Sequence, residues 1–186
     1  MYTLLLVDDE EDVIEVIERK VSWEQIGFHV VGHAGNGFKA LEMMEDMQPD
    51  VVMTDIRMPY MDGLELCSNI RQRFPATKLL LFTGFDDFEY AKEAVHLEIE
   101  EYILKPLNLA EITEVFKKLK TKLDDELNEK KNTDILKQYY AASLPVLQSN
   151  FYTTLIEGRI PENELGRYMS DYKIVLELSL IHISEP

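Results

Sequence analysis

Four short segments in the first two thirds of the chain are apolar throughout, without the polar alternation of a strand that has one wet face. They are residues 4–7, 51–53, 79–82 and 102–104. Unbroken apolar runs of this length are typical of strands in a parallel sheet covered on both faces. Residues 28–34 predict one further strand.

Apolar residues at helical spacing separate these strands and predict the buried sides of helices. They are Val13, Ile14 and Ile17; Phe38, Leu41, Met44 and Met47; residues 64–74, which Pro75 ends; Phe88, Ala91, Ala94 and Val95, which Asp86 and Asp87 can cap; and, from about Leu109 onward, Ile112, Phe116, Leu119 and Leu123. Because strands and helices alternate and crossovers are right-handed, we predict an α/β fold. It is a doubly wound, five-stranded parallel sheet with strand order 2-1-3-4-5, followed by a helical extension.

The remainder of the chain divides by composition into further segments. We expect the sheet domain to cover residues 1–120 and a charged helical linker to cover residues 121–142. Residues 143–177 are predicted to start a middle region that is incomplete, with one helix beginning at Pro145 and closed by Gly158, and another beginning at Pro161. Residues 178–186 resemble translated sequencing-adapter DNA, so we expect them to be a non-native tail.

Composition limits the classes of function. The chain has 186 residues, 46% of them hydrophobic, and a formal net charge of −16. Such a charge argues against a basic face that binds nucleic acid. The sequence contains one cysteine, Cys67, which we predict on the buried side of a helix. The first apolar run lacks the basic flank of a signal peptide, and no run is long enough to span a bilayer, so we expect a cytoplasmic protein.

Polar residues stand where four predicted strands end. Asp8 and Asp9 follow the first strand, Asp55 the third, Thr83 the fourth and Lys105 the fifth. In open α/β sheets, the carboxyl ends of the strands form the edge where ligands bind. Two carboxylates about 4 Å apart repel by about 4 kcal/mol at an effective dielectric near 20, which a cation relieves. An oxygen-rich site of this kind suits Mg²⁺.

These residue types also suit phosphoryl transfer. An aspartate beside a metal and a lysine can act as a nucleophile and form an acyl phosphate. A threonine such as Thr83 can donate a hydrogen bond to a phosphoryl oxygen and draw its loop inward. Taken singly, Asp8 and Asp9 could be helix caps, Thr83 a strand end and Lys105 a surface residue. Their joint placement at one sheet edge favours a site.

With these residues in view, the chain resembles the receiver domain of two-component response regulators over residues 1–120. The motifs that carry the resemblance are residues 6–10 (LVDDE), residues 54–59 (TDIRMP), Asp62-Gly63, Thr83-Gly84 and residues 104–106 (LKP). The resemblance implies a CheY-like, flavodoxin-like fold. It also implies a metal site in which Asp9, Asp55 and the backbone carbonyl of Arg57 bind Mg²⁺ directly and Asp8 assists, often through water.

The resemblance further implies a switch. Asp55 would be the phosphoacceptor, Lys105 would contact the phosphoryl group, and Thr83 and Tyr102 would form the switch pair. A sensor histidine kinase would be the phosphoryl donor. The protein would not be an enzyme, although it would assist its own phosphorylation and dephosphorylation. Whether phosphorylation produces a homodimer is left open.

Residues 21–28 and 85–91 resemble the YesN-type branch more narrowly. In that branch a variable middle region and an AraC-type helix-turn-helix pair follow the receiver, so the full protein would bind DNA and control transcription. No basic recognition helix follows Lys131, so we expect a protein truncated before that domain. Glu98 stands where the branch has glycine, and a left-handed residue there costs about 1–2 kcal/mol, so we expect the local helix end to differ.

Two other functions remain open at this stage. A stand-alone receiver would act by docking a partner protein, as CheY-like proteins do. A Mg²⁺-dependent phosphohydrolase would form an aspartyl-phosphate intermediate. Haloacid-dehalogenase-like hydrolases place the nucleophile after the first strand in an Asp-x-Asp arrangement, whereas this strand ends in Asp8-Asp9.

Overall fold

The computed structural model describes residues 1–84, 96–106 and 108–174. It divides into two compact units, Met1–Asp125 and Glu126–Pro186. The helix predicted over residues 86–95 and the tail predicted at residues 178–186 lie outside the described residues. Among those that are described, no helix combines the length and the apolar character needed to cross a membrane.

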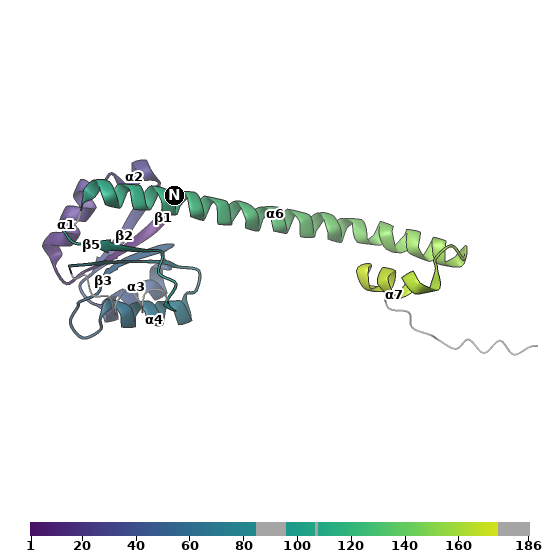
Figure 1. The fold of residues 1–186 in the computed structure, drawn as a ribbon, viewed down its shortest axis with the longest axis horizontal. Coiled ribbons are helices and arrows are strands. Elements are labelled where there is room, and N and C mark those ends of the chain that lie inside the picture. The colour runs from purple at the N-terminus through teal and green to yellow at the C-terminus, as the bar shows by residue number, and fades with distance from the viewer. Residues whose placement is uncertain (85–95, 107, 175–186) are drawn as a thin grey trace, which may run out of the picture. The chain divides into compact units, whose positions relative to one another are not determined.

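The first unit is built on a parallel sheet of five strands (Figure 1). The strands are β1 (Tyr2–Val7), β2 (Phe28–Ala34), β3 (Val51–Asp55), β4 (Lys78–Thr83) and β5 (Glu101–Leu104). Their order is β2-β1-β3-β4-β5, and every pair is parallel. The predicted fold class and strand order are therefore confirmed. The central strand β3 is buried along its whole length, which explains why its sequence has no polar alternation.

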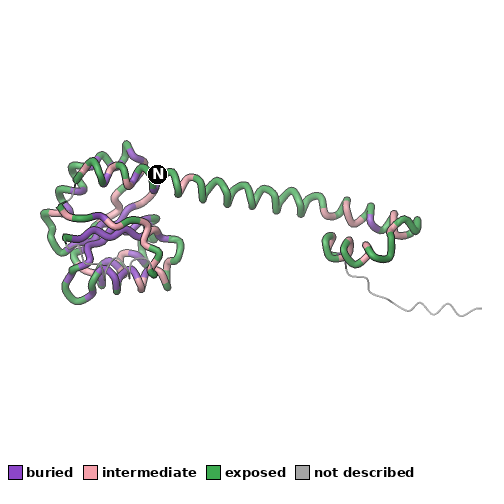
Figure 2. The backbone as a smooth tube through the Cα atoms, in the orientation of Figure 1, coloured by how far each residue is buried: buried purple, intermediate pink, exposed green. Residues whose placement is uncertain are grey.

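Helices cover both faces of this sheet, and Figure 2 shows the buried strands between them. The helices are α1 (Glu11–Lys20), α2 (Trp23–Ile26), α3 (Gly37–Met47), α4 (Gly63–Arg73) and α6 (Leu109–Ile156). One core contains residues of α1, α2 and the first turns of α6 against Leu4, Leu6 and Met53. The other contains residues of α3 and α4 against Leu5 and Val52. Successive strand residues point to opposite faces, so each strand contributes to both cores.

Two residues of the predicted stripe on α3 are not buried. Phe38 is 60% exposed and Met47 is 44% exposed, whereas Ala40 and Met44 are buried. With 3.6 residues per turn, Phe38 lies nearly opposite Ala40 around the helix axis, and Met47 lies in the last turn. The prediction was therefore wrong for both helix ends. The helix α2 was not predicted, because four residues are too few to show a period.

The second unit contains the end of α6 and the helix α7 (Glu162–Asp171). Phe151 is buried there, with the rings of Tyr168 and Tyr172 at centroid distances of 6.5 and 6.4 Å. The prediction that Pro145 begins a helix is wrong, since Pro145 lies inside α6. An internal proline costs roughly 3 kcal/mol, but the helix continues because its neighbours on both sides are good helix formers.

The turn before β5 also differs from expectation. Glu98 keeps a left-handed conformation with φ of 52°, although it is not glycine. The Arg71 guanidinium donates hydrogen bonds from Nε to the Leu97 carbonyl at 3.1 Å and from Nη2 to the Glu98 carbonyl at 2.9 Å. The sequence predicts a local rearrangement that avoids this conformation, and this prediction is wrong. Hydrogen bonds from the charged Arg71 side chain offset the free-energy cost of the left-handed residue.

The thiol of Cys67 is expected to be unreactive in the folded protein. Cys67 is fully buried on α4, as predicted, and burial raises the pKa of its thiol to about 12. Because the thiolate is the reactive form, a disulfide reagent at pH 8 should react at least about 100-fold more slowly with native than with unfolded protein. The raised pKa stabilises the folded state below the unfolded pKa of about 8.5, and this contribution is lost as the pH rises toward 12.

An exposed thiol provides the control for this measurement. Ser149 is exposed on α6, so a Ser149→Cys variant should gain one fast-reacting thiol while Cys67 stays protected. Fast reaction of wild-type native protein would show that Cys67 is accessible and would contradict the prediction.

Candidate functional site

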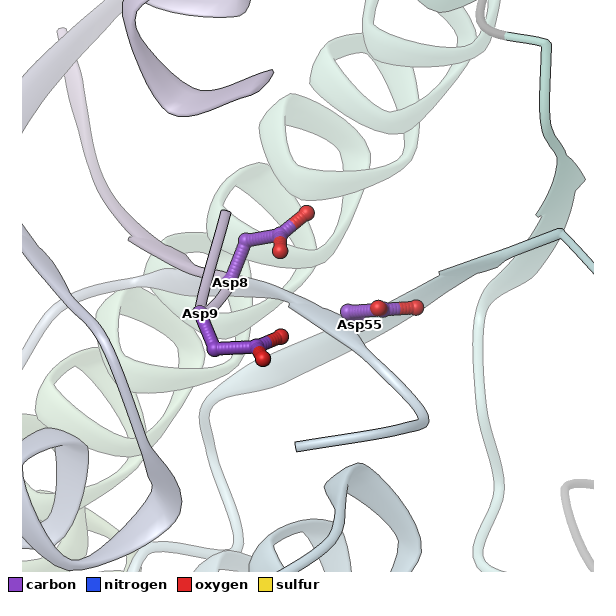
Figure 3. Close-up of side chains that lie close together, drawn as sticks. All are labelled: Asp8, Asp9 and Asp55. Carbon is purple, nitrogen blue, oxygen red and sulfur yellow. The ribbon is translucent and has the colours of Figure 1, made fainter. Parts of the chain in front are cut away.

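Three carboxylates from two neighbouring strand ends gather at the carboxyl edge of the sheet. Asp8 and Asp9 follow β1, and Asp55 ends β3. Each can offer one oxygen such that all three oxygens lie within 4.8 Å of one another, and Figure 3 shows the three side chains close together. Asp8 is fully buried and Asp55 is 6% exposed, whereas Asp9 is exposed. The sequence placed these residues at one edge, and the structure brings them into one cluster.

Backbone amides hold the two buried carboxylates in place. The Glu10 amide donates to Asp8 Oδ1 at 2.8 Å, and the Ile56 amide donates to Asp55 Oδ1 at 2.8 Å. The Asp8 amide donates to the Ala34 carbonyl of β2 at 3.1 Å. One oxygen of each carboxylate is therefore held by the backbone, and Oδ2 of each faces the side chain of Lys105.

Lys105 places its ammonium group between these carboxylates. Its Nζ atom lies 3.1 Å from Asp8 Oδ2, 3.3 Å from Asp55 Oδ2 and 3.6 Å from Glu10 Oε1. The Nζ atom also lies over the ring of Phe82, 5.0 Å from the ring centroid. The Lys105 amide donates to the Thr83 carbonyl at 2.7 Å, so β4 and β5 end side by side at the site. Glu10 was not singled out from the sequence, because it is one of five consecutive acids.

Burial and charge act in opposite directions on these groups. Desolvation raises the pKa of Asp8 and of Asp55, although Lys105 and the backbone donors lower them in part. Burial alone would lower the pKa of Lys105, but the carboxylates of Asp55 and Asp8 outweigh it and raise that pKa. One ammonium group thus faces the buried carboxylates of Asp8 and Asp55, whose charged forms burial destabilises, and a divalent cation would complete the balance of charge.

The loop that leaves Asp55 approaches the backbone of α4 closely. The Gly63 amide donates to the Ile56 carbonyl at 2.8 Å, and a Cβ atom at Gly63 would lie 2.0 Å from the Asp55 carbonyl oxygen. Asp62 caps α4, because its Oδ1 accepts from the Glu65 amide at 2.8 Å. The sequence contained Asp62-Gly63 as a motif, but periodicity could not reveal this contact between distant parts of the backbone.

The remaining predicted site residues belong to β4, to β5 and to the segment that follows β3. Thr83 is buried at the end of β4, and Tyr102 is half-buried on β5 beside the core of α3 and α4. Arg57 is exposed, two residues after Asp55. The roles of Thr83 and Tyr102 as a switch pair, and of the Arg57 carbonyl as a metal ligand, stay predictions.

Comparison with known proteins identifies the family. A family model described as the response regulator receiver domain matches residues 4–117. The chain belongs to this receiver family. Receiver domains are regulatory modules of two-component systems and not typical enzymes. The cluster of Asp8, Asp9 and Asp55, which could hold a metal ion, lies within the matched region.

Individual relatives are similar over the same region. The uncharacterized transcriptional regulatory protein YesN of Bacillus subtilis is 37% identical over 137 residues, which are 74% of this chain and 37% of YesN. The transcriptional regulatory protein HptR of Staphylococcus aureus is 26% identical over 164 residues, which are 88% of this chain and 64% of HptR. The chain therefore spans between about a third and two thirds of the length of these curated relatives.

Solved receiver structures are also similar. The receiver domain of AraT, a response regulator from Geobacillus stearothermophilus, is 36% identical with a TM-score of 0.64, covering 68% of this chain and 98% of that one. A two-component transcriptional regulator AraC from Clostridium phytofermentans is 31% identical with a TM-score of 0.62, again covering 68% and 98%. The resemblance to a receiver close to the YesN type is confirmed.

Proposed function

We propose that this receiver accepts a phosphoryl group on Asp55 from a sensor histidine kinase and, in the longer protein, controls transcription. The observation that carries the proposal is the cluster of Asp8, Asp9 and Asp55 with Lys105 Nζ 3.1 and 3.3 Å from two of its carboxylates. With a divalent cation bound, an acidic cluster that also holds one fixed ammonium group is suited to a reaction that brings a phosphoryl group to the site.

The donor set suits Mg²⁺. The cluster offers only carboxylate oxygens, which are hard ligands, and Mg²⁺ typically takes one or two carboxylates and keeps several waters. Asp9 and Asp55 would bind the ion directly with the Arg57 carbonyl, and Asp8 would assist. When bound, Mg²⁺ neutralises charge on the carboxylates and on the oxygens of the transferring group.

The residues of the chain then have distinct roles in the transfer. Asp55 Oδ2 attacks the phosphorus of the donor's phosphohistidine, so an oxygen–phosphorus bond forms, the nitrogen–phosphorus bond breaks and the imidazole keeps the electron pair. The Ile56 amide holds the other oxygen, Oδ1, at 2.8 Å and orients the carboxylate. Lys105 stays protonated, because the neighbouring carboxylates raise its pKa, and its charge offsets that of the phosphoryl group.

The switch and the output are further parts of the proposal. Thr83 would donate a hydrogen bond to the phosphoryl group, and Tyr102 would respond on β5. The similarity to YesN and HptR supports transcriptional control through a DNA-binding domain outside this sequence, in a cytoplasmic protein. Regulatory docking without DNA is the alternative, and no observation favours a phosphohydrolase.

The dependence on metal tests the site directly. Phosphoramidate, a small donor with a nitrogen–phosphorus bond, should phosphorylate wild-type protein with Mg²⁺ and not with a chelator, as measured by intact mass. An Asp9→Asn variant should need roughly 10- to 100-fold more Mg²⁺ for half-maximal labelling, because it loses a proposed ligand.

A control variant on α3 can remove the same charge as Asp9→Asn. Asp46 is exposed on α3 and does not belong to the cluster, so Asp46→Asn should leave the Mg²⁺ requirement of wild type unchanged. Equal labelling of wild-type protein with and without the chelator would contradict the metal site, and the absence of any labelling would contradict the proposed function.

A further inference from the structure

The loop between β3 and α4 exposes an aromatic residue beside the acidic site. Tyr60 is 86% exposed, five residues after Asp55. Its neighbours in the same loop, Met58 and Met61, are 9% and 5% exposed. Met58 and Met61 therefore anchor the loop on both sides of Tyr60, while Pro59 and the Tyr60 side chain are exposed to solvent.

The backbone at Tyr60 is strained. Its φ is 71°, and the Met61 amide donates to the Pro59 carbonyl at 2.9 Å, which closes a γ-turn of the rare positive-φ form around Tyr60. Among the described residues, the other non-glycine residues with positive φ are Gln48, Glu98 and Lys173, all polar. A bulky aromatic residue in this conformation is a true outlier, and glycine would be the relaxed choice.

Contacts around the turn hold this strained conformation. Met61 packs on the start of α3, where a Cβ at Gly37 would lie 2.6 Å from Met61 Cγ. On the α4 side, the Gly63 amide is bonded to the Ile56 carbonyl at 2.8 Å. Because both ends of the loop are fixed, Tyr60 cannot relax inward without breaking them. The folded protein thus keeps the aromatic ring of Tyr60 exposed on a backbone conformation that costs free energy. Contacts of the exposed ring do not offset this cost.

The loop between β3 and α4 differs in charge from the segment that follows β1. Residues 9–12, after β1, are all acidic and exposed. Residues 58–61 carry no charge, and they lie between one exposed cation, Arg57, and one exposed acid, Asp62. A protein that delivers a phosphoryl group brings negative charge to a chain whose net charge is −16. Its approach is less opposed over residues 57–61 than over residues 9–12.

We propose that Tyr60 is a specificity-determining contact for the phosphohistidine-bearing protein that donates to Asp55. This inference rests on the proposed function, because it takes Asp55 as the acceptor. The Tyr60 ring packs against the apolar surface of the donor protein beside its phosphohistidine, while the transferring group enters the acidic site. Buried aromatic anchors contribute a large share of the affinity of protein interfaces. A small phosphodonor has no surface for Tyr60 to contact.

The test compares a protein donor with a small donor. Tyr60→Gly relieves the positive φ and removes the ring, so it should fold with an unfolding midpoint no lower than wild type. Its kcat/KM should fall at least about 10-fold, mainly through KM, with the autophosphorylated cytoplasmic portion of a histidine kinase chosen because it phosphorylates wild type. Its rate of phosphorylation by phosphoramidate should stay within about two-fold of wild type, because the acceptor site is unchanged.

Two further variants sharpen the comparison. Tyr60→Phe keeps the ring and should retain the wild-type rate with the kinase. Tyr139, 70% exposed on α6, is a matched aromatic residue outside the first unit, and Tyr139→Ala should leave both donors unaffected. A kinase rate of Tyr60→Gly equal to wild type, or an equal fall with both donors, would overturn the inference. Failure of wild-type protein to accept from phosphoramidate would instead overturn the proposed function.

Discussion

An Asp55→Asn variant is expected to lose phosphorylation by acetyl phosphate or phosphoramidate, with labelling at least about 10³-fold slower than wild type. The amide oxygen of asparagine is a poor nucleophile and cannot form the acyl phosphate. Asp55 is 6% exposed and its Oδ2 atom lies 3.3 Å from Lys105 Nζ, so the acceptor oxygen stands beside the positive charge of the site. Intact mass before and after hydroxylamine treatment separates an acyl phosphate, which hydroxylamine cleaves, from a phosphate ester, which it does not.

The control for this variant is again Asp46→Asn, which removes the same charge from the exposed side of α3 and should label like wild type. Unchanged labelling of Asp55→Asn would exclude Asp55 as the acceptor, whatever the rest of the site does. The fold should survive the change, because the asparagine oxygen can still accept from the Ile56 amide, which lies 2.8 Å from Oδ1 in the wild type.

A Gly63→Ala variant should lower the free energy of unfolding of the first unit by about 3 kcal/mol. The added Cβ atom would lie 2.0 Å from the carbonyl oxygen of Asp55 and 2.9 Å from its carbonyl carbon. Both atoms belong to the backbone at the end of a buried strand, so neither can rotate away as a flexible side chain would. The clash must displace α4 or the acceptor itself.

Fluorescence of Trp23 during urea unfolding measures this effect. Trp23 is the only tryptophan in the sequence and is 5% exposed, with its ring 4.7 Å from that of Phe116, so it reports on the first unit. Gly35→Ala is the control, because its nearest non-neighbouring atom, the Asp8 carbonyl oxygen, lies 4.0 Å from the added Cβ. Equal stability of Gly63→Ala and Gly35→Ala would show that the backbone accommodates the methyl group.

Predictions of burial and of helix ends failed where contacts with distant parts of the chain decide the conformation of a segment. Phe38 belongs to an apolar series, yet the sheet covers only the side of α3 that bears Ala40 and Met44. Pro145 is a favourable first residue of a helix, yet it lies inside α6 because the residues before it also favour helix. Glu98 keeps a costly conformation because Arg71, 27 residues earlier, donates to its carbonyl. None of these neighbours can be read from a short window of sequence.

The alternation of apolar runs with helical periods determined the strands and the edge at which Asp8, Asp9, Asp55, Thr83 and Lys105 stand, and the doubly wound topology typical of that alternation predicted the strand order. The edge could be predicted because parallel strands share one direction, so residues that end them must meet at the same side of the sheet. Only the tertiary structure decided which carboxylate oxygen faces Lys105, why residue 63 must be glycine, and that Tyr60 is held outward on a strained turn. These features depend on distances of a few ångströms between segments far apart in the chain, which no local period encodes.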